Sequence, residues 1–294
     1  MTRDAAPLAG LIILDGWGLN PRAEGNAVLA ARTPVMDALL RAWPHSKLVT
    51  WGESVGLPHG QMGNSEVGHL NLGAGRIVAT DLSRIDRAIE AGDLVRNPVL
   101  REALARTKER GGALHLLGLH STGGVHSHLR HLHALLRIAA EAGVAKLHVH
   151  AITDGRDVPP RCALADLAAT EAVFRAIGRG RFATVAGRYY AMDRDKRWDR
   201  TQRAYRAMVL GEGERAGSAV EAVERAYARG EDDEFILPTA IVRDGEDATI
   251  ARGDTILTFN FRPDRMRQIT RALADPDFGA FPRPRWPLDE LRVV

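Results

Sequence analysis

The sequence lacks cysteine pairs and long hydrophobic runs, and each absence excludes a class of protein. A single cysteine, Cys162, cannot form an internal disulfide, so the chain is not a disulfide-stabilised scaffold. The longest apolar runs, residues 8–14 and 255–259, fall far short of the roughly 18 to 20 residues of a membrane helix. Asp4 near the N-terminus and the lack of a small-residue cleavage site argue against a signal peptide. We therefore expect a cytoplasmic protein with no membrane partner.

Lysine is also scarce. Of the 40 basic residues, 36 are arginines and only four are lysines, namely Lys47, Lys108, Lys146 and Lys196. The 37 acidic residues nearly balance them, and a net charge of +3 gives little of the one-sided charge of nucleic-acid binders. Arginine grips phosphate and carboxylate through two parallel hydrogen bonds, so the bias is compatible with a phosphorylated or acidic substrate. More often, arginine and alanine together reflect GC-rich coding sequence. No nucleic-acid partner is expected.

The length and composition indicate a globular protein of about two domains, with 294 residues, 45% apolar and 26% charged. A boundary is expected near residues 76–82, because the Gly73-Ala74-Gly75 turn ends one region and a helical pattern begins at Asp81. We therefore divide the chain into residues 1–79 and 80–294. The prolines of residues 275–294 favour a linker there rather than the end of a fold.

A short apolar run, a polar loop and a helix-period segment follow one another repeatedly along the chain. The apolar runs are residues 8–14, 113–119, 147–152, 182–186 and 255–259. Helical patterns between them stop at Gly143 and Gly178. Alternating strands and helices predict an α/β fold with largely parallel sheets flanked by helices. In such sheets, ligands bind outside the carboxyl ends of the strands.

Two residues in the first region are candidates for metal binding and nucleophilic chemistry. Asp15 follows the first apolar run and precedes Gly16, so its carboxylate can project into a crevice as a metal ligand, or it can cap the next helix. Ser65 precedes a short helical stretch, whose backbone N–H groups favour an anion. A serine hydroxyl must be activated by a base or a metal, and Asp15 as co-ligand favours the metal. Alternatively, Asn64 or Ser65 is simply the N-cap of that helix.

Histidines and arginines follow the later predicted strands. His131, His133, His148 and His150 are interpreted as structural, because no zinc-binding spacing is present. His126 differs, since it closes a glycine-rich loop where it could donate a proton or contact a phosphate. The arginines after strands are Arg156, Arg188, Arg194, Arg262 and Arg265, with Asp157 among them. They would suit a small substrate with phosphate and carboxylate groups, unless they are solvated loop residues.

Six motifs, in this order, resemble those of the 2,3-bisphosphoglycerate-independent phosphoglycerate mutases, members of the alkaline-phosphatase-like metalloenzymes. The matching segments are residues 13–18, 61–69, 123–128, 153–157, 187–195 and 259–265. They read ILDGWG, QMGNSEVGH, GGVHSH, TDGRD, GRYYAMDRD and FNFRPDR. The resemblance therefore covers nearly the whole chain.

The resemblance implies a glycolytic and gluconeogenic isomerase that moves a phosphate between the 3- and 2-hydroxyls of glycerate, without 2,3-bisphosphoglycerate as cofactor. Ser65 would become phosphoserine, and Asp15 and Ser65 would ligate one of two manganese ions. The implied substrate-binding residues are His126, Arg156, Asp157, Arg188, Arg194, Arg262 and Arg265. Residues 1–79 would begin an alkaline-phosphatase-like metal-binding domain and residues 80–294 would form a phosphotransferase domain, which clamp to exclude water. A monomer with only the small-molecule substrate as partner is expected.

Members of this family continue beyond the point that corresponds to Val294, and their C-terminal part supplies the Asp and His ligands of both metals. The chain therefore resembles an N-terminal fragment, and we expect it to be inactive without that part. An alternative is a non-catalytic phosphoglycerate-binding module built on the five arginines. Nucleic-acid binding is a third hypothesis, which predicts a steep salt dependence of DNA binding.

Overall fold

The computed structural model describes residues 9–244, 246, 248–288 and 290–294. The chain divides into two compact units, one up to Ser83 and one from Arg84 to Val294. This division falls a few residues after the boundary that the sequence places between residues 79 and 80. The helix α4 (Asp81–Glu90) contains the point of division.

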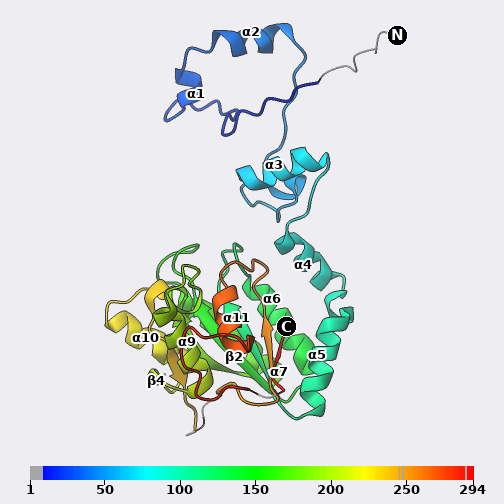
Figure 1. The fold of residues 1–294 in the computed structure, drawn as a ribbon. Coiled ribbons are helices and arrows are strands. Elements are labelled where there is room, and N and C mark those ends of the chain that lie inside the picture. The colour runs from blue at the N-terminus through cyan, green and yellow to red at the C-terminus, as the bar shows by residue number, and fades with distance from the viewer. Residues whose placement is uncertain (1–8, 245, 247, 289) are drawn as a thin grey trace. The chain divides into compact units, whose positions relative to one another are not determined.

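The second unit is built on a seven-stranded sheet with the strand order β4-β5-β3-β2-β1-β6-β7 (Figure 1). Neighbouring strands are parallel except β3 and β5, which are antiparallel. The strands are β1 (Ala113–Leu119), β2 (Lys146–Thr153), β3 (Arg181–Gly187), β4 (Glu214–Ala216), β5 (Thr239–Ile241), β6 (Thr255–Thr258) and β7 (Arg292–Val293). The predicted α/β fold with a largely parallel sheet is confirmed, because β1, β2, β3 and β6 correspond to apolar runs identified in the sequence.

Two hydrophobic clusters cover the two faces of this sheet. Along β1, Leu116 belongs to the cluster that includes residues of α5, α6, α7 and α10, and Leu117 to the one that includes residues of α9 and α11. All of β1 is buried, as is typical of a parallel strand covered on both faces. The helices are α5 (Pro98–Glu109), α6 (Leu129–Glu141), α7 (Ala163–Ile177), α8 (Arg188–Ala191), α9 (Trp198–Leu210), α10 (Ala219–Ala228) and α11 (Arg267–Ala274), with 3-10 turns at Leu94–Arg96 and Asp233–Phe235.

The expectation of a linker over residues 275–294 is wrong. Phe278 and Phe281 are buried in the cluster that includes α9 and α11, with their ring centroids 4.7 Å apart. The strand β7 then pairs with β6 and extends the sheet. The prolines of this segment prevent regular helix, but they do not prevent aromatic side chains from burying their large apolar surface.

The first unit is largely irregular and has little core. Its helical segments are α1 (Ala27–Ala30), α2 (Pro34–Ala42), a 3-10 turn at Gly52–Val55 and α3 (Ser65–Ala74). Only Val55, Leu57 and Val67 form a buried hydrophobic cluster among its described residues. Across the described part of the whole chain, no helix combines the length and apolarity needed to cross a membrane.

The predicted strand over residues 8–14 is not formed. Residue 8 lies outside the described residues, and residues 9–14 form no strand, with Leu11 and Ile12 being 73% and 87% exposed. An isolated extended segment leaves its backbone N–H and C=O groups without partners, and this unit offers no other strand in its described residues. Apolar side chains of α2, such as Val35 and Leu39, are exposed as well.

A chain of buried side chains crosses the sheet at β1, β2 and β3. The Thr184 hydroxyl lies 2.9 Å from His150 Nδ1, and His150 Nε2 lies 2.9 Å from His115 Nδ1. His115 Nε2 lies 3.1 Å from the Asp254 carboxylate. Because a carboxylate can only accept, His115 donates to Asp254, His150 donates to His115, and Thr184 donates to His150. Each of these three hydrogen bonds therefore joins one donor to one acceptor.

Burial keeps several histidines of this unit neutral. It lowers the pKa of His120 to about 3, with His133 adding to the effect. It also lowers the pKa of His148 to about 3, where His115 and Arg181 contribute further, and holds the pKa of His150 well below its ordinary value. In the unfolded chain these side chains take up a proton near pH 6.5.

We therefore expect the free energy of unfolding to be constant above about pH 6.5 and to fall as the pH drops below it, by up to roughly 1.4 kcal/mol per pH unit for each neutral histidine. Urea titrations at pH 7.5, 6.0 and 5.0 measure this slope. The variant His120→Asn should reduce it, whereas the variant His59→Asn, at an exposed position, should not. A stability independent of pH over this range would contradict the assignment.

Candidate functional site

Ser65 opens the helix α3 in the first unit. The residue before it, Asn64, is the N-cap, and its side-chain oxygen accepts from the backbone N–H of Val67 at 3.0 Å. Gly63 is required there, because a Cβ at this position would lie 1.7 Å from the carbonyl oxygen of Thr50. The N-cap role therefore belongs to Asn64, and the Ser65 hydroxyl is left for other contacts.

The Ser65 hydroxyl lies beside Asp15, as the sequence predicts for a shared metal site. Its Oγ donates to Asp15 Oδ2 at 2.8 Å. His69 Nδ1 lies 2.8 Å from the Ser65 carbonyl oxygen, to which it must donate, and 3.2 Å from Ser65 Oγ. Asp15 lies in a turn in which the Trp17 N–H donates to the Leu14 carbonyl at 3.1 Å. The expectation that a buried strand precedes Asp15 is wrong, because residues 9–14 form no strand.

The Asp15 and Ser65 oxygens fit two positions around a hard divalent cation, which prefers oxygen ligands. The described residues contain no group of three or more His, Cys, Asp or Glu side chains that could hold a metal ion. The residues present therefore fit part of one metal site, and a complete coordination shell needs ligands from other sources.

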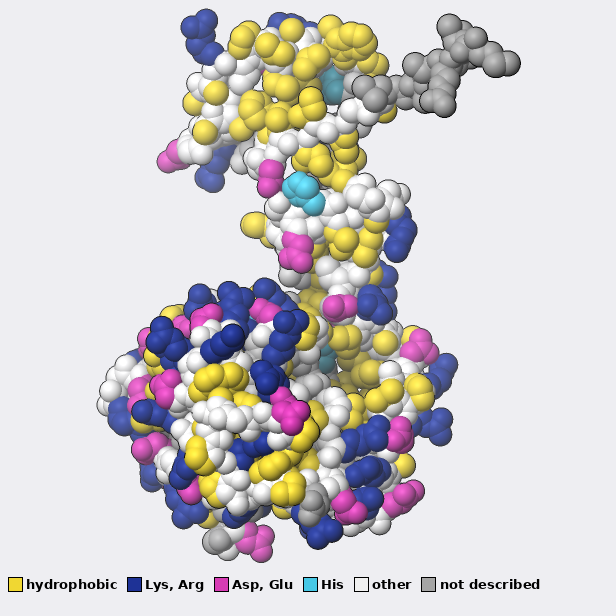
Figure 2. Space-filling model, in the orientation of Figure 1, with side chains coloured by type: hydrophobic (Ala, Val, Ile, Leu, Met, Phe, Trp, Pro, Cys, Tyr) yellow, Lys and Arg dark blue, Asp and Glu magenta, His cyan; other side chains and the backbone are white. Residues whose placement is uncertain are grey.

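The second candidate site lies at the carboxyl ends of four neighbouring strands in the second unit. His126 follows β1, Arg156 and Asp157 follow β2, and Arg188 follows β3 directly. Arg194 comes later in the loop after α8, while Arg262 and Arg265 follow β6. Figure 2 shows Lys and Arg side chains gathered on this part of the second unit. We call the set His126, Arg156, Asp157, Arg188, Arg194, Arg262 and Arg265 the arginine cluster.

Arg188 lies at the centre of the arginine cluster and is 4% exposed. Its Nη1 donates to Asp154 Oδ1 at 2.5 Å and to Asp157 Oδ2 at 2.6 Å. Its Nη2 donates to His126 Nε2 at 3.2 Å, so the proton of a neutral His126 resides on Nδ1. Burial and the charge of Arg188 lower the pKa of His126, which favours this neutral form.

Carboxylates also hold the outer arginines. Asp264 Oδ2 accepts from Arg194 Nη1 at 3.0 Å, and Asp264 Oδ1 lies 3.1 Å from Arg262 Nε. Glu234 accepts from Arg156 Nη1 at 3.3 Å. These guanidinium groups are exposed enough to exchange the carboxylates for a ligand anion.

Arg265 differs from the other arginines of the cluster. Its Nη1 donates to the Met192 carbonyl oxygen at 3.3 Å, and none of the ion pairs among the described residues includes it. Burial lowers its pKa, and the positive charges of Arg188, Arg194 and Arg156 lower it further. An anion bound beside Arg265 would relieve this repulsion.

The structure thus brings together the seven cluster residues predicted from the sequence, and separately the pair Asp15 and Ser65. The sequence interpretation missed Asp154 and Asp264, which hold the cluster's arginines in place. Both lie inside the motifs TDGRD and FNFRPDR, so the signal was an acidic residue within an arginine-bearing loop. The interpretation of His131 and His133 as structural agrees with their contacts: His131 Nε2 lies 2.9 Å from Asp86, and His133 Nε2 lies 2.9 Å from Thr170.

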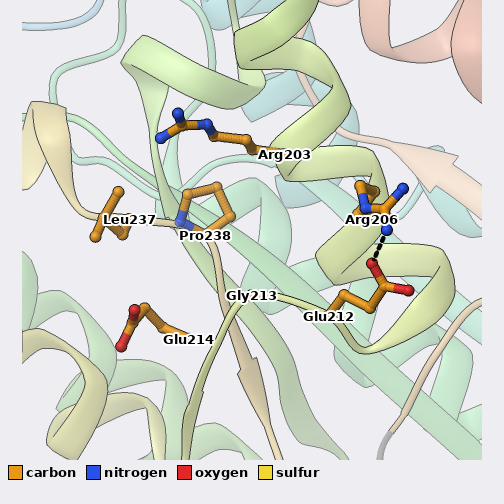
Figure 3. A pocket seen from close by; sticks show the side chains of 7 residues that line it. All are labelled: Arg203, Arg206, Glu212, Gly213, Glu214, Leu237 and Pro238. Carbon is orange, nitrogen blue, oxygen red and sulfur yellow. Dashed lines mark ion pairs between the residues drawn. The ribbon is translucent and has the colours of Figure 1, made fainter. Parts of the chain in front are cut away.

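A hollow of about 270 Å³ lies elsewhere in the second unit, beside the edge strand β4 (Figure 3). Its charged lining residues are Arg203, Arg206, Glu212 and Glu214, and Arg206 forms an ion pair with Glu212. Acidic and basic groups are evenly matched here, so this hollow does not favour an anion as the arginine cluster does.

Known proteins resemble the chain over most of its length. The family model described as the BPG-independent PGAM N-terminus matches residues 85–293. A 2,3-bisphosphoglycerate-independent phosphoglycerate mutase of Desulforudis audaxviator is 57% identical over 93% of this chain and 54% of its own. A protein of the same name from Thermomicrobium roseum is 54% identical over 99% of this chain and 56% of its own. The chain thus spans about half the length of these curated relatives.

A solved structure agrees with this similarity. The phosphoglycerate mutase of Leishmania mexicana, crystallised at low cobalt concentration, superposes with a TM-score of 0.77 at 36% sequence identity. The match covers 96% of this chain and 53% of that one.

We expect the variant Arg265→Ala to lower the affinity for inorganic phosphate by about tenfold or more, because a charge-assisted hydrogen bond to the anion is lost. Isothermal titration calorimetry at fixed ionic strength measures the change. The matched control is Arg206→Ala, which removes an arginine outside the cluster and should leave phosphate affinity unchanged. Equal losses in both variants would show a non-specific charge effect and contradict the assignment.

Proposed function

The chain belongs to the family of 2,3-bisphosphoglycerate-independent phosphoglycerate mutases, and from that premise we propose that it takes part in the interconversion of 3-phosphoglycerate and 2-phosphoglycerate. The arginine cluster of the second unit would bind the phosphoglycerate. Ser65 of the first unit would carry the phosphate between the two hydroxyls.

The single observation that carries the binding proposal is the gathering of five guanidinium groups and His126 at one edge of the sheet, with Arg265 in no ion pair with another described residue. Phosphoglycerate has a phosphate at one end and a carboxylate at the other. Guanidinium groups bind both through paired hydrogen bonds. The carboxylates of Asp264 and Glu234 hold the exposed arginines in the absence of ligand, and a substrate anion would compete with them.

The chemistry proposed for Ser65 is transfer in two half-reactions. The Ser65 Oγ releases its proton and forms a bond to phosphorus while the bond from phosphorus to the 3-oxygen of glycerate breaks, and that oxygen takes up a proton. The 2-hydroxyl then releases its proton as its oxygen bonds to phosphorus, the bond from phosphorus to Ser65 Oγ breaks, and Oγ takes up a proton again. Asp15, which accepts the hydrogen bond from Oγ, orients the attacking oxygen.

In this proposal, Asp15 and Ser65 would also hold one of two divalent ions such as Mn²⁺. A bound divalent ion would lower the pKa of the serine hydroxyl and stabilise charge on the transferring phosphate. Two oxygen ligands do not complete a coordination shell. For this reason we propose that the 294-residue chain binds phosphoglycerate but does not turn it over by itself.

A calorimetric titration of the chain with 3-phosphoglycerate tests the binding. We expect saturable binding, lost in the double variant Arg262→Ala, Arg265→Ala and retained in Ser65→Ala, because the cluster residues all belong to the second unit. Absence of binding to the unmodified chain would refute the proposed function.

A coupled assay for 2-phosphoglycerate formation with added Mn²⁺ tests the chemistry. We expect negligible turnover by the chain alone, since the described residues offer only part of one metal site. Robust turnover that Ser65→Ala abolishes would support the serine chemistry and refute the expected inactivity. Binding without turnover is also what a non-catalytic phosphoglycerate-binding module would show. A full-length relative distinguishes the two, since there the serine corresponding to Ser65 must be needed for turnover.

A further inference from the structure

Asp154 is a buried carboxylate beside the arginine cluster that the proposed function does not use. It follows the last residue of β2 and is 3% exposed. A buried carboxylate is stable only when hydrogen-bond donors and a positive charge compensate it. Its surroundings supply both, from several loops.

The contacts of Asp154 connect the carboxyl ends of three adjacent strands. From the loop after β1, the Ser121 hydroxyl donates to Asp154 Oδ2 at 2.6 Å. Within its own turn, Asp154 Oδ1 accepts from the backbone N–H groups of Arg156 at 3.2 Å and Asp157 at 3.0 Å. From the end of β3, Arg188 Nη1 donates to the same oxygen at 2.5 Å. One side chain thus fixes three loops that carry the cluster.

A second hydrogen bond of Ser121 stabilises the loop after β1. Ser121 Oγ, fully buried, accepts from the backbone N–H of Gly123 at 3.0 Å. This contact fixes the start of the glycine-rich loop that ends at His126. Burial would raise the pKa of Asp154, but hydrogen bonds from Ser121, from the Asp157 backbone and from Arg188 outweigh burial and lower it. The group therefore stays an acceptor at neutral pH.

The two carboxylates on Arg188 differ in exposure. The Asp157 side chain is 19% exposed, whereas that of Asp154 is 2% exposed. Asp157 can change partner when a ligand enters. Asp154 cannot, because all its contacts are internal. Arg188 therefore keeps Asp154 as a fixed partner, while its other contacts are to Asp157 and His126.

We propose that Asp154 is a positioning residue for the phosphoglycerate site, which holds the Arg188 guanidinium and the turn of Arg156 and Asp157 in the geometry that binds the anion. This inference rests on the proposed function of the cluster. Asp154 acts through these residues and does not itself contact the substrate.

The experiment compares Asp154→Ala with Asp154→Asn by calorimetric titration with 3-phosphoglycerate. Asparagine keeps an oxygen acceptor for Arg188 and for the two backbone N–H groups, and its amide can donate to Ser121 Oγ. We expect Asp154→Ala to lose about tenfold or more in affinity, as for a lost charged hydrogen bond, and Asp154→Asn to stay within about threefold of the unmodified chain. Equal losses in the two variants would mean that charge, not position, matters, and would overturn the proposal.

The matched control is Asp254→Ala. Asp254 is also buried, and it accepts from the backbone N–H groups of Ala113 and Ala251 and from His115, but at the amino ends of β1 and β6. A general loss of stability would affect both alanine variants alike. We expect Asp254→Ala to keep its phosphoglycerate affinity, and an equal loss there would overturn the proposal. Should either alanine variant not fold, Ser121→Ala removes one partner of Asp154 and should lower the affinity by a smaller factor, while no change would overturn the proposal.

Hydrogen exchange in the ligand-free chain separates this proposal from the proposed function. The backbone amides of Arg156 and Asp157 should exchange faster in Asp154→Ala and at the unmodified rate in Asp254→Ala. If the unmodified chain fails to bind 3-phosphoglycerate, the proposed function fails, and the exchange rates alone decide whether Asp154 holds this turn. Unchanged rates in Asp154→Ala would overturn the positioning role.

Discussion

Repulsion among guanidinium groups is the constraint on which the second unit's candidate site depends. Five arginines converge at one edge of the sheet, and their like charges repel one another where water is partly excluded. The fold offsets this repulsion with carboxylates from the same loops and with Glu234 from the 3-10 turn at Asp233–Phe235. Asp154 and Asp157 compensate Arg188, Asp264 compensates Arg194 and Arg262, and Glu234 compensates Arg156. Each carboxylate therefore stabilises the charge of its arginine when no ligand is bound.

The carboxylates that pair with the arginines differ in burial. This difference determines which of them a ligand anion can displace. The Asp154 side chain is almost fully enclosed, whereas those of Asp264 and Arg194 are 28% and 48% exposed. Exposed ion pairs contribute little to stability, so exchanging their carboxylate for a substrate anion costs little. A buried pair is far harder to break, because a lone charge would remain inside the protein. The position of the buried Arg188 is therefore fixed before a ligand binds, whereas the exposed arginines can exchange their carboxylate partners for a ligand.

The sequence predicted most of the sheet because its strands are buried on both faces. Residues 113–119 read ALHLLGL, a mostly apolar run, and form β1 with those same bounds. The short strands β4, β5 and β7 were not predicted, since two or three residues give no periodicity and their pairing depends on distant partners. The packing of Phe278 and Phe281 was missed for a similar reason: prolines were taken as a sign of a linker, but burial of aromatic side chains is decided by tertiary contacts.

The sequence indicated which residues gather in the candidate site. It did not predict which of them are hydrogen-bonded to one another, or in which direction. A motif shows that Arg188, Asp157 and His126 belong to it. It does not show that His126 accepts from Arg188 and that its proton therefore lies on Nδ1. Likewise, no role for Asp154 was predicted, because a buried carboxylate and an exposed loop carboxylate look the same in a motif. Burial and hydrogen-bond direction separate these cases, and both depend on loops that are far apart in the chain.

The two units differ in how strongly burial fixes the orientation of their candidate site residues. In the second unit, Arg188 and Asp154 are removed from water, so their orientation is set before any ligand binds. In the first unit, the side chains of Ser65, Asp15 and His69 are exposed, and water competes for the hydrogen bond between Ser65 and Asp15. A nucleophile in water is neither oriented nor activated enough for phosphoryl transfer, which also requires that water be kept from the phosphorylated intermediate. The anion binding proposed for the arginine cluster can therefore reside in the second unit alone, whereas the chemistry proposed for Ser65 would require further ligands and the exclusion of solvent.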